Sequence, residues 1–199
     1  MAQDFNAAYW QHRYLQSNTG WDTGGITPPL KSYFDQLENK AVRILIPGCG
    51  NAYEAEYLYR NGFENVYLVD LAPAPLQNFA QRVPDFPEDQ LLNRDFFELG
   101  GKYDLIVEQT FFCALDPALR PAYAQKMASL LAPGGKLVGL LFDTTFQKPG
   151  PPFGGNREEY RKYFEPYFNF IHFETACNSI PPRQGSELFI LLELKKLQE

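Results

Sequence analysis

Two glycines and an aspartate in the first half of the chain have the types and order needed to hold a nucleoside. Gly48 and Gly50 flank Cys49 in a short turn between two apolar stretches, VRILIP and ENVYLVD, and Asp70 ends the second stretch. Glycines after a buried strand let the backbone approach a ligand, and a carboxylate ending the next strand can accept from ribose hydroxyls. The pattern predicts a nucleoside-bearing cofactor held by this turn, Asp70 and the adjacent Leu71.

The residue at the place of a third glycine separates two classes of cofactor. Dinucleotide-binding turns follow G-x-G-x-x-G, but Tyr53 stands at the last position of this pattern. A large side chain there disfavours the pyrophosphate of a dinucleotide and leaves room for a ligand with a carboxylate, such as S-adenosylmethionine. The turn alone leaves both an S-adenosylmethionine enzyme and an NAD(P)-dependent oxidoreductase open.

Acidic and aromatic residues also end the strands that follow. Asp95 and Phe96, in LLNRDFFEL, fall where a third strand would end, and Glu108 ends the run KYDLIVE. An aspartate can accept from an adenine amine while an aromatic residue meets the ring. Because parallel strands bring their carboxyl ends to one edge of a sheet, we expect Asp70, Asp95 and Glu108 to line one cofactor site there.

The elements that would position these residues alternate between strand and helix. Strand-length apolar runs precede stretches with helical patterning, at residues 52–60, 73–82 and 117–131, the last opened by Asp116 as N-cap and by Pro117. The alternation predicts an α/β fold: a single doubly wound Rossmann-like domain, with helices on both faces of a mostly parallel seven-stranded sheet. FNFIHFETA and ELFILLELKKL are joined too closely for a helical crossover, which predicts an antiparallel C-terminal strand pair.

Composition limits the classes of protein that the chain can belong to. Its 199 residues are 45% hydrophobic and carry a formal charge of −6, which suits one globular domain and argues against nucleic-acid binding. No apolar run reaches the length of about 18 residues that a membrane helix needs, and no leader pattern is seen, so we expect a cytoplasmic protein. Three scattered cysteines and two histidines predict neither a metal site nor disulfides. We expect a monomer.

Several longer motifs are spread over nearly the whole chain: GWDTGGITPPL, RILIPGCGNAYEAEYLYRNG, FFCALDP, PGPPF and SIPPRQGSE. Together they resemble the thiopurine S-methyltransferase family, especially its thiol and halide methyltransferase branch. The resemblance implies a class I methyltransferase fold with residues 1–40 as a helical cap over the cofactor and residues 41–199 as the Rossmann-like core. It also implies S-adenosylmethionine as methyl donor and a small soft nucleophile, a thiol, sulfide or halide, as acceptor.

The resemblance also assigns roles to single residues. Trp21 matches the family's N-terminal tryptophan segment over the methionine end of the cofactor, and Arg183 matches an arginine near the acceptor. Glu108 stands where many members have aspartate, with its contact then made to the methionine amine. Phe153 stands where the halide branch tends to have tyrosine, which favours a thiol over a halide.

The expected reaction is an in-line methyl transfer to a thiolate, which requires positioning rather than a covalent protein nucleophile. Arg183 is the predicted catalytic residue, because a permanent positive charge favours a thiolate bound beside it. Trp10, Trp21 and Phe153 are predicted as aromatic walls around the sulfonium and the acceptor, whereas Phe111 is expected in the core. A selenium or tellurium acceptor, or a protein that binds S-adenosylmethionine without turnover, stays open.

Overall fold

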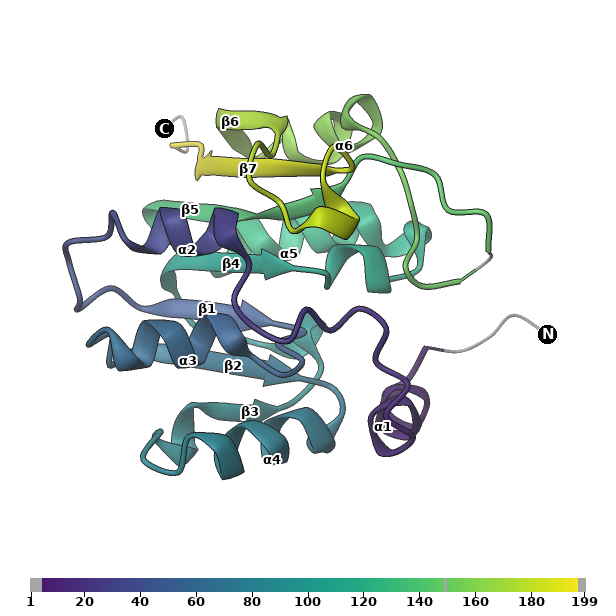
Figure 1. Cartoon of the computed structure of the whole chain (residues 1–199). Coiled ribbons are helices and arrows are strands. Elements are labelled where there is room, and N and C mark those ends of the chain that lie inside the picture. Colours follow the sequence, from purple (N-terminus) through teal and green to yellow (C-terminus); the bar gives the residue numbers. More distant parts are fainter. Residues whose placement is uncertain (1–4, 149, 197–199) are drawn as a thin grey trace.

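The computed structural model describes residues 5–148 and 150–196 and contains one seven-stranded sheet. Residues 1–4 of the predicted cap, and residues 149 and 197–199 of the predicted core, lie outside the described residues. The sheet has the order β3-β2-β1-β4-β5-β7-β6 (Figure 1). The strands are β1 (Ile44–Pro47), β2 (Val66–Asp70), β3 (Leu91–Asn93), β4 (Tyr103–Gln109), β5 (Leu131–Phe142), β6 (Phe168–Thr175) and β7 (Glu187–Leu194).

The pairing confirms the predicted mixed sheet. β1 to β5 are mutually parallel where they are neighbours, and their carboxyl ends therefore share one edge. β7 runs antiparallel to β5 and to β6. The short connection between β6 and β7 explains this reversal, since a parallel pair needs a crossover of a dozen or more residues.

Helices cover both faces of the sheet, and each face has its own apolar core. α2 (Pro28–Phe34), α3 (Tyr53–Arg60) and α4 (Pro73–Arg82) pack on one face, and α5 (Arg120–Leu130) and α6 (Arg157–Phe164) pack on the other. Strand alternation divides the residues between the two: Ile44 and Ile46 face the first core and Leu45 faces the second. A strand buried on both faces reads as a continuous apolar run, as VRILIP does.

The predicted helix at residues 117–131 is divided in the structure. Pro117–Leu119 forms a 3-10 turn, α5 begins at Arg120, and Leu131 already belongs to β5. Pro121 has no N–H to donate to a helical carbonyl one turn earlier, so a continuous α-helix from Pro117 would lack that bond. Asp116 caps the 3-10 turn as expected, because its Oδ1 accepts from the Ala118 N–H at 2.8 Å.

The N-terminal region contributes to the fold in two different ways. α1 (Ala7–Leu15) lies beyond the carboxyl ends of the strands (Figure 1), where the Gln11 side chain accepts from the Ala74 N–H at 2.9 Å. α2 instead buries Leu30 and Phe34 against the sheet. Of the predicted cap at residues 1–40, the part that faces the ligand-binding edge is therefore residues 5–23, and α2 belongs to the core.

Candidate active site

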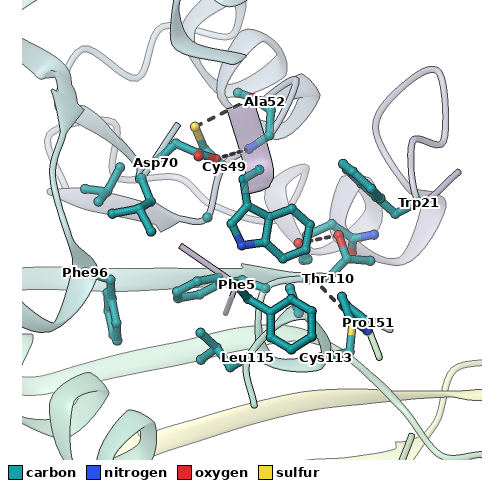
Figure 2. Close-up of a pocket in the computed structure, with 18 of the residues that line it drawn as sticks. Phe5, Trp21, Cys49, Ala52, Asp70, Phe96, Thr110, Cys113, Leu115 and Pro151 are labelled. Atoms are coloured by element: carbon teal, nitrogen blue, oxygen red, sulfur yellow. Dashed lines mark hydrogen bonds between the residues drawn. The ribbon is translucent and has the colours of Figure 1, made fainter. Parts of the chain in front are cut away.

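A cavity of about 640 Å³ opens at the carboxyl edge of the sheet, a size typical of small-molecule sites. The turns after β1, β2 and β4 form its floor, and α1 with the segment after it forms one wall. Figure 2 shows Asp70 and Phe96 on one side, with Cys113 and Pro151 across from them. The predicted residues that line it are Trp10, Trp21, Gly48, Cys49, Gly50, Asp70, Leu71, Asp95 and Phe96.

The two glycines of the turn have a left-handed backbone, and aromatic side chains occupy the space that a Cβ would need there. Gly48 has φ +56° and Gly50 has φ +53°. A Cβ on Gly48 would lie 2.2 Å from Cδ2 of Phe111, and one on Gly50 would lie 3.1 Å from the Tyr14 hydroxyl. The glycines therefore make room for Phe111 and Tyr14, in addition to exposing the turn to the cavity.

Cys49, between the two glycines, is buried. Burial is the largest cause that raises the pKa of its thiol well above the ordinary value, and the nearby Asp70 carboxylate raises it further. A protonated, buried thiol is a poor nucleophile. Cys49 is thus a packed turn residue that lines the cavity.

Asp70 is held in place by two backbone donors. Its Oδ2 accepts from the Gly50 N–H at 3.1 Å, and its Oδ1 accepts from the Ala72 N–H at 2.9 Å. Burial raises its pKa to about 6, although these backbone hydrogen bonds oppose the rise. Each carboxylate oxygen has lone pairs beyond the one that these bonds use, so both can accept from a ribose diol.

Asp95 and Phe96 follow β3 at the same edge. Asp95 caps the 3-10 turn Phe96–Glu98, and its Oδ1 accepts from the Phe97 N–H at 2.8 Å. Phe96 is 4% exposed and meets the Phe111 ring edge-on at 5.3 Å between centroids. The structure thus brings Asp95 and Phe96 to the cavity together with Asp70.

Glu108 lies outside the cavity wall, which differs from the predicted contact with the cofactor amine. Its Oε1 accepts from the N–H groups of Phe111 and Phe112 at 2.8 and 2.9 Å, and the Tyr123 hydroxyl donates to its Oε2. The residue is completely buried, and burial raises its pKa to about 7. Glu108 therefore shapes the turn after β4, from which Phe111 projects into the cavity.

Trp10, Tyr14 and Trp21 pack against one another in the N-terminal wall of the cavity. The Trp21 ring meets Trp10 and Tyr14 edge-on, at 5.6 Å between centroids in each case. The Arg13 guanidinium lies over the Trp21 ring at 4.8 Å. Trp10 and Trp21 were expected here from the sequence, and Tyr14 joins them because it lies one helical turn after Trp10.

Arg183 and Phe153, the two predicted acceptor residues that remain, are not among the residues lining the cavity. The Arg183 guanidinium donates to Glu187 Oε1 at 3.2 Å and to the Trp21 carbonyl at 2.6 Å. The Phe153 N–H donates to the Cys113 carbonyl at 2.6 Å, and its ring packs edge-on against Phe5. Both residues therefore stand behind the wall and contact lining residues.

Several residues of the cavity had no clear signal in the sequence. Phe111 was expected in the core but lines the cavity, as do Glu54, Gln109 and Thr110. Thr110 has φ +58°, a strained conformation for a β-branched residue that tends to occur at functional sites. Gln109 Oε1 is buried and has no hydrogen-bond partner among the described residues.

Three buried carboxyl groups should make stability depend on pH. Burial raises the pKa of Asp70 to about 6 and those of Glu54 and Glu108 to about 7, against roughly 4 in an unfolded chain. The folded state therefore binds protons more tightly, and this stabilisation is present below about pH 4 and lost as pH rises through the folded pKa values. Urea denaturation should give a lower free energy of unfolding at pH 8 than at pH 5.

A substitution assigns part of this pH dependence to one group. In Glu54→Gln, the free energy of unfolding should fall less between pH 5 and pH 8 than in the unmodified chain, because the amide does not ionise. Glu64 is at an exposed position. In Glu64→Gln, the free energy of unfolding should therefore fall as much as in the unmodified chain. A Glu54→Gln curve parallel to that of the unmodified chain would contradict the assignment.

The described residues contain neither a metal-binding cluster nor a membrane-spanning helix. Among the described residues, no group of three or more histidine, cysteine, aspartate or glutamate side chains is arranged to hold a metal ion. Over residues 5–148 and 150–196, no helix has the length and apolar character needed to cross a membrane.

Comparison with known proteins identifies the family. A sequence profile described as thiopurine S-methyltransferase matches residues 5–187. Probable thiol methyltransferase 2 of Arabidopsis thaliana is 32% identical over 184 residues, which cover 89% of this chain and 81% of the relative. Thiocyanate methyltransferase 1 of Brassica oleracea is 29% identical with the same coverages. The fold matches 1,6-didemethyltoxoflavin-N1-methyltransferase of Burkholderia thailandensis, with TM-score 0.77, 14% identity and coverage of 96% of this chain and 87% of that chain. The chain belongs to the thiopurine S-methyltransferase family.

Proposed function

We propose that this small-molecule methyltransferase methylates a small, largely apolar thiol, with S-adenosylmethionine as the methyl donor. The observation that carries the proposal is the division of the cavity. Asp70, Asp95 and Phe96 line it from the ends of β2 and β3, whereas Cys113, Leu115 and Pro151 line it from the segments after β4 and β5. Figure 2 shows Asp70 across the cavity from Cys113 and Pro151. The first group suits a nucleoside, and the second suits an apolar acceptor.

The residues on the nucleoside side fit the cofactor. Asp70 would accept from the ribose hydroxyls, Asp95 and Phe96 would meet the adenine, and the glycine turn with Trp21 would enclose the methionine end. Gln109 Oε1, buried without a partner among the described residues, offers an acceptor for the ammonium of that end. The bound cofactor supplies an activated methyl group on a positively charged sulfur, which aromatic faces attract.

The chain's own contribution at the acceptor side is to exclude water and to position sulfur. Phe5, Phe111 and Leu115 present apolar surface there, and the partly exposed Leu119 stands at the rim. A thiolate has less water to lose in such a place than a hard anion. No base is required, because a free thiol with a pKa near 8.5 is already a few per cent ionised at neutral pH. Turnover should therefore rise with pH until the acceptor thiol is ionised.

Two measurements test the proposal. In isothermal titration, S-adenosylhomocysteine should bind and NAD should not, whereas binding of NAD alone would favour an oxidoreductase. With S-adenosylmethionine present, benzenethiol should then be converted to its methyl thioether faster than iodide or thiocyanate at equal concentration. Methylation of iodide or thiocyanate without methylation of benzenethiol would show that the acceptor is an inorganic anion and not a thiol. Tight cofactor binding without turnover of any of these acceptors would indicate a binding protein.

A further inference from the structure

We propose that Arg183 and Arg120 are positioning residues. Each holds a different segment of the cavity rim in place by donating a hydrogen bond to a backbone carbonyl of that segment. Arg183 fastens the segment that carries Trp21, and Arg120 fastens the segment at residues 151–154. If the proposed function holds, the first controls affinity for the cofactor and the second controls affinity for the acceptor.

The contacts of Arg183 join regions far apart in the sequence. Nη2 donates to the Trp21 carbonyl at 2.6 Å, across a separation of 162 residues, and Nη1 donates to Glu187 Oε1 at 3.2 Å. Arg183 is 9% exposed and Glu187 is 3% exposed, and the guanidinium also lies over the Phe142 ring at 5.3 Å. A buried charge pair with a specific partner holds its geometry closely, because few alternatives satisfy both charges. Trp21 is thus fixed to the core from behind.

The contacts of Arg120 fasten the opposite rim in the same way. Nη1 pairs with Glu159 Oε1 at 2.7 Å, and Nη2 donates to the Gly154 carbonyl at 2.8 Å and more weakly to that of Phe153 at 3.4 Å. Arg120 is 1% exposed. The same segment is held on its other side, where the Phe153 N–H donates to Cys113. Pro151 and Pro152, the first two residues of this segment, line the cavity.

Neither guanidinium is among the residues that line the cavity. Arginine suits this task because its planar fork can donate to a carboxylate and to a carbonyl at once. Lysine keeps the positive charge beside the paired glutamate, Glu187 or Glu159, but concentrates it at a single nitrogen. An Arg→Lys change should therefore loosen the carbonyl contact while it avoids leaving the glutamate unpaired.

The test compares Arg183→Lys and Arg120→Lys with Arg161→Lys, a control at an exposed position on α6. Arg183→Lys should weaken S-adenosylhomocysteine binding about tenfold, the loss expected for one charge-assisted hydrogen bond. It should also speed amide hydrogen exchange in residues 18–23, with little change in the KM of the thiol at saturating cofactor. Arg120→Lys should raise the thiol KM, speed exchange in residues 153–155, and leave cofactor affinity unchanged. The Arg161→Lys control should change none of these.

Glu187→Gln provides a second route to the same test if Arg183→Lys folds poorly. It keeps an acceptor for Arg183 but removes the matching charge, so exchange at residues 18–23 should rise without any change in the cavity lining.

The pH profile separates positioning from direct stabilisation of a thiolate. If Arg183 positions Trp21, the turnover of Arg183→Lys at saturating cofactor should keep the shape of its pH dependence. Unchanged cofactor affinity and exchange, with a selective loss of turnover below the thiol pKa, would overturn the proposal. Should the unmodified protein fail to bind S-adenosylhomocysteine, the proposed function fails, yet the exchange measurements still decide whether the two arginines fasten the rim.

Discussion

Replacing Asp70 by alanine is expected to weaken S-adenosylhomocysteine binding by about 100-fold or more. The substitution removes the acceptor proposed for the ribose and leaves the Gly50 and Ala72 N–H groups without the carboxylate that they now contact. Each buried donor left unpaired costs about 1 to 3 kcal/mol, so the turn and the ligand contact are lost together. Isothermal titration measures the affinity directly.

A matched control separates the ribose contact from the general loss of a carboxylate. The Asp104 carboxylate also accepts from a backbone N–H, that of Arg43 at 2.8 Å, but at an exposed site outside the cavity. Asp104→Ala should bind S-adenosylhomocysteine as the unmodified chain does. If Asp70→Ala, Asp104→Ala and the unmodified chain bound S-adenosylhomocysteine with equal affinity, Asp70 would not contact the cofactor.

Gly48→Ala should lower the free energy of unfolding by about 2 to 5 kcal/mol, the sum of two separate costs. A left-handed backbone is unfavourable for alanine, and Gly48 has φ +56°. The new Cβ would also lie 2.2 Å from Cδ2 and 2.8 Å from Cβ of Phe111. Phe111 cannot move freely, because its backbone is held by Glu108 and its ring packs against Phe96.

Gly62→Ala measures the first cost alone. Gly62 has φ +85°, and a Cβ there would meet nothing within 4 Å. Urea denaturation should therefore find Gly62→Ala clearly less destabilised than Gly48→Ala. Adding Phe111→Ala to Gly48→Ala should cost less than Phe111→Ala costs in the original chain, since it removes Cγ and Cδ2, the two closest clashing atoms, and leaves only the Cβ at 2.8 Å. If both glycine variants lost the same free energy of unfolding, the Phe111 side chain would have to move away from the new Cβ at no energetic cost.

The order of elements and the ligand-binding edge could be predicted from the sequence because both depend on local patterns. The run of apolar residues identifies a doubly buried strand, and Pro73 and Arg82 bound a helix that the structure reproduces. Parallel strands place the residues at their carboxyl ends along one edge of the sheet, so Asp70 and Asp95 lie at the cavity. Trp10 and Trp21 do so as well, and the sequence motifs indicated the correct family.

The direction of a side chain at the end of a strand is decided by distant partners, which is why other assignments differ. Glu108 could point to either side of β4, and the Tyr123 hydroxyl on α5 together with two amide donors draws it away from the cavity. Arg183 donates to the Trp21 carbonyl, and no local sequence pattern predicts a contact between residues so far apart in the chain. Phe111 reaches the cavity because Gly48 leaves the space empty.

The place of β7 between β5 and β6 has a consequence for how the protein is made. β6 precedes β7 in the chain but lies at the edge of the sheet and pairs with β7, so it can join the sheet only after β7 has been synthesised. β7 then joins the two parts, and it brings Glu187 to Arg183 in the same step. A chain cut short before residue 187 would keep Arg183 and Asp70 yet lack both β7 and the Glu187 carboxylate that pairs with Arg183.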